Sequence, residues 1–214
     1  CEDPTHEALQ IIPHDKVVQV LTSERDLVCL DAATLQWKDR LVAGGEVTDV
    51  VLLDSRLGSV AVAGNRPAIR IHELTEGSLA CQHWLTGHES AVLCLAWLAD
   101  EAAVEAPSSG WLVSGSRDHT VRVWRCQGGV WTAVGCLAGH TDAVSSVAVL
   151  RQQGRLVIAS AGADCTLKLW DWPLEGQGRC RWTVRAHEKE VNQCVLTASG
   201  VWTAGQDKLA KEWA

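Results

Sequence analysis

A histidine, a serine or threonine, and an aspartate are the residue types of a hydrolytic triad, and they occur together in three segments of the chain. The first set is His88, Ser114 and Asp118. Such a triad activates one hydroxyl nucleophile through its histidine, and an enzyme needs one tuned site rather than three copies of it. Histidines outside these sets lack metal-ligand spacing, and no glycine-rich phosphate loop occurs. The sequence therefore predicts no catalytic, metal or cofactor site.

The three sets belong to an internal repeat. In each, an aspartate follows the serine or threonine by four residues, a tryptophan follows the aspartate by six, and a histidine preceded by a small residue lies upstream. The aspartates are 46 and 43 residues apart. Between histidine and hydroxyl lie alternating apolar stretches such as AVLCLAW (91–97), which predict half-buried strands. The members are His88, Ser114, Asp118 and Trp124; His140, Ser160, Asp164 and Trp170; and His187, Thr203, Asp207 and Trp213.

A period near 43 residues, with a Gly-His start and a terminal tryptophan, resembles the WD40-repeat β-propeller family. The resemblance implies an all-β fold of about five four-stranded blades, part of an incomplete propeller that closes at seven. The expected units are 1–40 and 41–82, both degenerate, then 83–130, 131–180 and 181–214, with an acidic loop insertion at 99–110. In the second unit Arg66 and His72 stand where aspartate and tryptophan are expected.

The same resemblance implies a role for the repeated residues. In the family they form structural tetrads, buried hydrogen-bond networks that link the histidine to the aspartate and, through the hydroxyl, to the tryptophan. A satisfied buried network specifies one geometry, whereas a partly satisfied one is destabilising. Family members usually bind partners on the face that carries the histidine loops and aspartate turns. Here this candidate partner-binding face contains Glu89, Ser90, Arg117, His119, Thr141, Asp142, Glu188, Lys189, Glu190, Gln206 and Lys208.

Composition limits the classes of function. The net charge is −7 with 47% hydrophobic residues, and no apolar run approaches the length of a membrane span. Residues 1–110 carry a net −10 and residues 111–214 a net +3, so bulk electrostatics disfavour nucleic-acid binding and only a small local basic face stays possible. Nine cysteines without any CxxC spacing indicate a reducing compartment. The chain does not start with methionine and is expected to be part of a longer one.

A closer resemblance runs over nearly the whole chain. The segments LTSERDLVCLDAATLQ, HEKEVN and TAGQDKLAKEW are similar to the second propeller of the UTP-B WD-repeat subunits of the small-subunit processome. This implies a non-catalytic scaffold of the nucleus and nucleolus that acts in pre-rRNA processing and small ribosomal subunit biogenesis. Its implied partners are other WD-repeat proteins of a large complex, the U-three small nucleolar ribonucleoprotein and pre-rRNA, with direct RNA contact left open. No membrane or small-molecule substrate is implied.

A substrate-recognition adaptor, for example of a ubiquitin ligase, is the alternative, as is another nuclear or cytoplasmic scaffold. Such adaptors cluster arginine and lysine on the loop face to bind phosphorylated or acidic peptides. Arg117 and Lys208 fit that pattern, whereas Glu89, Asp142 and Glu188 oppose it. The sequence favours the scaffold and leaves the adaptor as a hypothesis for binding experiments.

Overall fold

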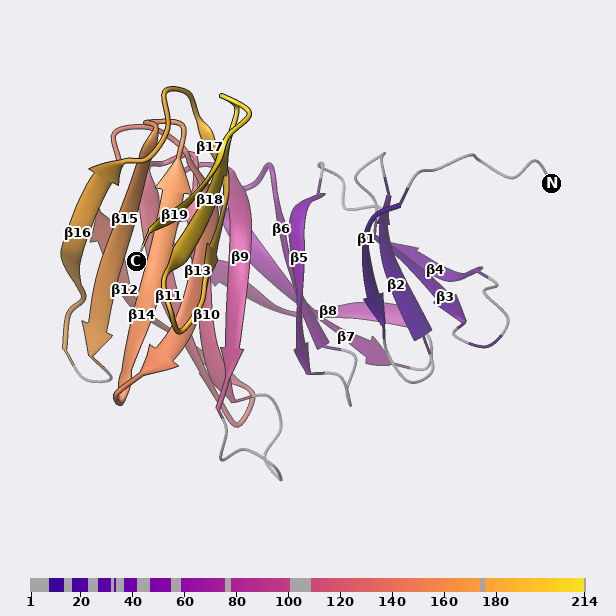
Figure 1. Ribbon diagram of the computed structural model, residues 1–214. Helices are drawn as coiled ribbons and strands as arrows, with labels where there is room; N and C mark the ends of the chain where they lie inside the picture. Colours follow the sequence, from indigo (N-terminus) through magenta and orange to yellow (C-terminus); the bar gives the residue numbers. More distant parts are fainter. Residues whose placement is uncertain are drawn as a thin grey trace.

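The computed structural model describes residues 8–13, 17–22, 27–31, 33, 37–41, 47–54, 59–75, 78–100, 109–173 and 176–213. Within these ranges the chain is all-β, as the repeat predicts, and every element is a strand. The strands form five antiparallel sheets in which each strand pairs with the next one along the chain (Figure 1). A connection of this kind needs only a hairpin turn, which the short segments between the alternating apolar runs supply.

The strands of the five sheets have the following bounds. The first sheet contains β1 (Ala8–Pro13), β2 (Val17–Thr22), β3 (Leu27–Asp31) and β4 (Trp37–Leu41). The second contains β5 (Val47–Asp54), β6 (Ser59–Gly64), β7 (Ala68–Thr75) and β8 (Ser78–Thr86). The third contains β9 (Val92–Ala99), β10 (Gly110–Ser116), β11 (Thr120–Gln127) and β12 (Val130–Ala138). The fourth contains β13 (Val144–Gln152), β14 (Arg155–Gly162), β15 (Thr166–Pro173) and β16 (Arg179–Arg185). The fifth contains β17 (Val191–Leu196), β18 (Val201–Gly205) and β19 (Ala210–Trp213).

The second to fifth sheets follow one another like blades. Their first strands, β5, β9, β13 and β17, are neighbours in space. Apolar side chains of consecutive sheets pack together, and Val123 of β11 and Ile158 of β14 belong to one buried cluster. The middle strands β6, β10 and β14 are buried almost throughout because each sheet is covered on both faces. The sequence pattern of these strands is accordingly apolar or small at nearly every position.

The structure departs from the expected units in two ways. In the last sheet the described residues form three strands, where four are expected per unit. The expected limits 40/41, 82/83, 130/131 and 180/181 all fall inside the outermost strand of a sheet, in β4, β8, β12 and β16. In the second to fourth sheets this strand directly precedes the next histidine loop. The acidic insertion connects β9 to β10, although its residues 101–108 lie outside the described ranges.

The degenerate second unit keeps the pairing of the complete ones. His72 of β7 lies opposite Val60 of β6, just as Trp124 lies opposite Leu112 in the third sheet. His72 is 2% exposed, so a smaller ring occupies the buried position of the tryptophan. The strand pairing therefore does not depend on a tryptophan at this place.

Candidate functional site

The first tetrad forms one continuous hydrogen-bonded chain. His88 lies in the loop before β9, Ser114 on β10, Asp118 in the β10–β11 turn and Trp124 on β11. The Nδ1 atom of His88 is 2.7 Å from Oδ2 of Asp118, and its Nε2 is 2.8 Å from Oγ of Ser114. Trp124 donates its indole N–H to the same Ser114 oxygen at 2.9 Å. The network thus joins the loop, the turn and two strands.

Protonation of the ring follows from these contacts. Burial lowers the pKa of His88 and outweighs the opposing influence of Asp118, so the imidazole is neutral near pH 7. A neutral ring has one donor and one acceptor. Nδ1 therefore donates to the carboxylate of Asp118, and Nε2 accepts the hydroxyl proton of Ser114. The Ser114 hydroxyl thus donates to His88 and accepts from Trp124, and every polar group of the set is paired.

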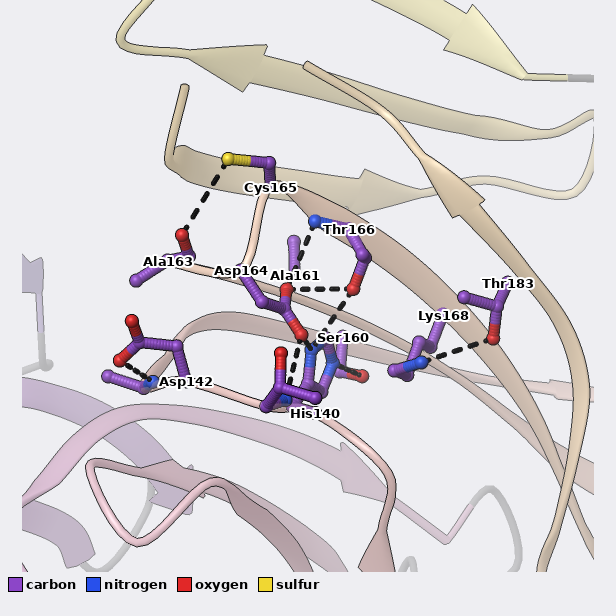
Figure 2. A network of polar contacts seen from close by, with 12 residues as sticks. His140, Asp142, Ser160, Ala161, Ala163, Asp164, Cys165, Thr166, Lys168 and Thr183 are labelled. Atoms are coloured by element: carbon purple, nitrogen blue, oxygen red, sulfur yellow. Dashed lines mark hydrogen bonds and ion pairs between the residues drawn. The ribbon is translucent and has the colours of Figure 1, made fainter. Parts of the chain in front are cut away.

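The other two tetrads repeat this geometry, and Figure 2 shows His140, Ser160 and Asp164 of the fourth sheet. His140 lies 2.8 Å from both Asp164 and Ser160, and Trp170 donates to Ser160 at 2.8 Å. In the fifth sheet His187 lies 2.8 Å from Asp207 and from Thr203 Oγ1, and Trp213 donates to Thr203 at 2.9 Å. The structure therefore brings together all twelve residues that the repeat singles out.

The aspartate of each tetrad holds two loops at once. Asp118 accepts the backbone N–H of Glu89 at 2.9 Å, and it also accepts the backbone N–H and the hydroxyl of Thr120 at 2.9 and 2.6 Å. Burial would raise the pKa of Asp118, but the hydrogen bonds from Thr120, Glu89 and His88 outweigh it and lower the pKa to about 2. Asp164 has the equivalent bonds and a lowered pKa for the same reason. Both carboxylates stay ionised and fix the loop and the turn to each other.

Two further residues of these networks lie outside the four positions that the repeat singles out. Thr120 and Thr166 each donate a hydroxyl to the aspartate two residues earlier, at 2.6 and 2.7 Å. The sequence does mark these threonines, because in the strings DHT and DCT a threonine follows the tetrad aspartate by two residues. The fifth sheet has Leu209 at this place, which gives Asp207 only a backbone N–H.

The glycine before His88 and before His140 has a steric reason. A Cβ atom on Gly139 would lie 3.1 Å from the ring of Trp170, and one on Gly87 would lie 3.3 Å from the ring of Trp124. Both glycines also have φ near +157°, at the edge of the region that side chains disfavour. The Gly-His pair thus lets the histidine loop lie directly on the tryptophan.

The hydroxyl groups of the tetrads are too buried for a hydrolytic role. Ser114 and Ser160 are 0% exposed and Thr203 is 2% exposed, so a substrate has no access to these hydroxyls. Among the described residues, no group of three or more histidine, cysteine, aspartate or glutamate side chains is placed to hold a metal ion. The same part of the chain has no helix with the length and apolarity needed to cross a membrane. The tetrads are therefore placed to position loops.

The candidate partner-binding face lies in the loops that the tetrads hold. Ten of its eleven residues are exposed, and Ser90 is half-buried. Within a sheet the two loops are joined directly, as by the backbone bond from Arg117 to Ala91 at 2.9 Å and the side-chain bond from Gln206 to Glu190 at 2.7 Å. His119 and Lys208 have φ of 68° and 66°, the left-handed conformation of a tight turn, and both are exposed. The face is polar and of mixed charge.

Consecutive sheets are also linked by polar side chains that the sequence analysis missed. Asp49 of β5 accepts the backbone N–H of Leu95 in β9 at 2.7 Å, and Ser146 of β13 accepts that of Cys194 in β17 at 3.0 Å. Both side chains occupy the third residue of the first strand of their sheet. Burial raises the pKa of Asp49 to about 6 despite its bonds to Leu95 and Val50. The shared signal in the sequence is a polar third residue in the first strand of each of these two sheets.

Comparison with known proteins agrees with this architecture. The pattern of the family described as WD domain, G-beta repeat matches residues 79–125 and 131–171. The two segments run from β8 to β11 and from β12 to β15, and they include two of the three tetrads. The chain therefore contains a WD40-repeat domain.

Three curated relatives show how far the similarity extends. Transducin beta-like protein 3 of Rattus norvegicus is 29% identical over 91% of this chain, and that of Homo sapiens is 29% identical over 92%. The nuclear distribution protein PAC1 of Yarrowia lipolytica is 34% identical over 71% of the chain and 36% of its own length. The chain spans about a quarter of the length of the first two relatives.

Proposed function

We propose that this chain is a non-catalytic scaffold domain that displays rigid loops to protein partners in a UTP-B-type complex of the small-subunit processome. Its place of action would be the nucleolus, and its role the processing of pre-rRNA during small ribosomal subunit biogenesis. Other WD-repeat proteins would bind it directly, next to the U-three small nucleolar ribonucleoprotein. The similarity to transducin beta-like protein 3 over nine-tenths of the chain supports this particular assignment.

The observation that carries the scaffold role is the repeated coupling of the tetrads to the loops. In three consecutive sheets a buried aspartate binds the backbone of the histidine loop and of the adjacent turn, as Asp118 binds Glu89 and Thr120. A preorganised loop loses less conformational entropy on binding than a mobile one. Because the first strands of the three sheets are neighbours, their histidine loops lie at the same end and present exposed polar residues there. Such a surface suits a partner of mixed charge.

Affinity purification of the full-length protein from its own cells tests the proposal. We expect other WD-repeat subunits and U-three ribonucleoprotein components to co-purify. The substitution Glu188→Lys on the candidate partner-binding face should reduce their recovery at least severalfold. Glu212→Lys reverses an equally exposed charge on β19, outside the loops, and serves as the matched control.

Two outcomes would contradict the proposal. Recovery of ubiquitin-ligase subunits, or of one modified client protein, would favour the adaptor hypothesis. Equal loss of partners from Glu188→Lys and Glu212→Lys would show that the loops are not the binding surface. A normal unfolding midpoint for both variants establishes that any loss reflects contacts rather than folding.

A further inference from the structure

A polar cleft lies at the end of the fourth sheet opposite the candidate partner-binding face. It has a volume of about 270 Å³ and opens between the β13–β14 turn and the adjoining ends of β15 and β16. Its polar lining consists of Gln152, Gln153, Arg155, Asp171, Arg179 and Arg181. We call it the arginine cleft. None of its residues belongs to a tetrad or to the loops that the tetrads hold.

The arginine cleft has an excess of positive charge. Its single carboxylate, Asp171, is 3.7 Å from Arg179 and 3.9 Å from Arg181. These separations exceed hydrogen-bond length, and the two arginine side chains are 75% and 56% exposed. One carboxylate cannot neutralise three guanidinium groups, so the cleft retains a charge near +2. Its donors face solvent and are available to an anion.

This charge is not a requirement of the outermost strand of a sheet. The corresponding strands β8 and β12, SLACQHWLT and VWTAVGCLA, contain no lysine, arginine, aspartate or glutamate, and β4, WKDRL, balances two basic residues with one acidic residue. By contrast β16, RCRWTVR, contains three arginines in seven residues. Charged side chains can protect a sheet edge from aggregation, but the second and third sheets manage without them. The arginines of β16 therefore call for another explanation.

Spacing and neighbours indicate the chemical class of the ligand. Guanidinium groups bind phosphate oxygens through two parallel N–H donors. Trp182 follows Arg181 on β16 and lines the neighbouring hollow that shares Arg181, just outside the arginine cleft. Its side chain is 38% exposed and packs edge-on against Trp213, with ring centroids 5.9 Å apart. Arginines beside an exposed aromatic ring are the combination that binds single-stranded nucleic acids, in which phosphates pair with the cations and a base stacks on the ring. An acidic protein segment would use the arginines but not the ring.

We propose that the arginine cleft binds single-stranded RNA, with phosphates on Arg155, Arg179 and Arg181 and a base against Trp182. The chain carries a net −7, so this contact rests on a local cluster and not on the overall charge. The site extends the proposed function by giving the scaffold a direct RNA contact. Its position opposite the candidate partner-binding face lets RNA and protein partners bind together.

Fluorescence anisotropy with a labelled oligouridylate of twelve nucleotides tests the cleft in the purified full-length protein. We expect saturable binding that weakens about tenfold or more in the double variant Arg179→Ala/Arg181→Ala. Loss of two phosphate contacts should also reduce the slope of log K against log salt by about 1.4, at about 0.7 per contact for single strands. Arg155→Ala, on a different strand, should show about half of that change in slope.

Arg185→Ala is the matched control because it removes an exposed arginine from the opposite end of β16, outside both the cleft and the candidate partner-binding face. It should leave affinity and salt slope unchanged. Loss of affinity in this variant equal to that of the double variant would overturn the proposal, as would absence of saturable binding to the parent protein. Competition by polyglutamate as effective as by RNA would assign the cleft to acidic proteins instead. Ultraviolet crosslinking should map RNA to the peptide containing Trp182.

The RNA-binding experiment does not depend on whether the protein belongs to the processome complex. Binding by the purified protein would stand even if no processome component co-purified with it. Conversely, recovery of those components by the Arg179→Ala/Arg181→Ala variant, together with lost RNA binding, would separate the protein contacts from the RNA contact. Both arginines are exposed, and an unchanged unfolding midpoint of the variant would show that the effect is local.

Discussion

The second and fourth sheets have the same strand order and pairing but differ in how they are held. Ser160 and Trp170 of the fourth sheet belong to a hydrogen-bonded tetrad. Val62 and His72 occupy the same places in the second sheet. Both sheets are well packed, since Ser160 and Val62 are each 0% exposed. A valine at the centre of the sheet serves packing as well as a hydrogen-bonded serine does.

The difference separates two tasks that the complete repeats combine. Apolar contact between neighbouring sheets is sufficient to build a blade, because it depends on area removed from water and not on direction. Directional bonds are needed to fix loops, and Asp164 supplies them to Thr141 and Thr166. The second sheet, with Arg66 in place of that aspartate, lacks this carboxylate in its turn. Loop placement is thus the property that the tetrads add to the fold.

Removing the tetrad tryptophan should have the largest effect. Trp170→Ala deletes a side chain that is 3% exposed and should lower the free energy of unfolding by about 3–5 kcal/mol, mainly through the cavity left behind. Trp84→Ala in the second sheet removes a side chain that is 53% exposed and should change it by less than about 0.5 kcal/mol. Urea unfolding of both variants checks this, and equal effects would contradict the assigned burial.

The buried carboxylate of the second sheet offers a pH test of opposite sign to the tetrads. Because the pKa of Asp49 is raised to about 6 in the folded protein, the folded state holds this proton more tightly than the unfolded state does. Its contribution to stability is complete below about pH 4 and is lost as the pH rises through about 6. Asp49→Ser introduces the neutral acceptor that the fourth sheet has at Ser146.

Relative to the parent, this variant should gain about 2–3 kcal/mol of stability between pH 4 and pH 7, the equivalent of a two-unit pKa shift. Unfolding by urea at the two pH values measures the difference. Other carboxyl groups titrate alike in both proteins and cancel from the comparison. An unchanged gap between parent and variant at the two pH values would show that Asp49 titrates normally.

Removing the tetrad carboxylate should have a smaller effect that falls mainly on the loops. Asp164→Ala should destabilise by about 1–3 kcal/mol, because His140 and the backbone of Thr141 lose their acceptor. The lowered pKa of Asp164 means that its contribution is present above its ordinary pKa and fades as the pH falls. The penalty measured by urea unfolding should therefore shrink below about pH 4.

The exposed Asp142, whose carboxylate accepts only the N–H of the next residue, provides the matched control. Asp142→Ala should be close to neutral at every pH. Amide hydrogen exchange adds a second measurement, in which Asp164→Ala but not Asp142→Ala should deprotect the loop at 139–143. Equal exchange in the two variants would mean that the loop is held by something other than the tetrad.

Most of the fold and the tetrads could be predicted from the sequence because both depend on short-range pattern. Alternation of apolar residues specifies strands, and the fixed spacing from Ser160 to Asp164 to Trp170 follows from one hairpin. Other features depend on contacts between sheets. Asp49 reaches Leu95, 46 positions away, and nothing near either residue marks the pair. The missed limits of the units have a similar origin, since β8 belongs to the sheet before the histidine loop.

By itself, the sequence of this protein determined the type of element, the repeat and the membership of the three tetrads. Local spacing is sufficient for these because each blade is a meander of adjacent strands. Only the tertiary structure decided which side chains meet across blades and which gather at one end of a sheet. The arginines of the cleft come from two separate strands, β14 and β16, and Asp171 comes from a third. Their shared charge exists only because the folded sheet brings those strands together.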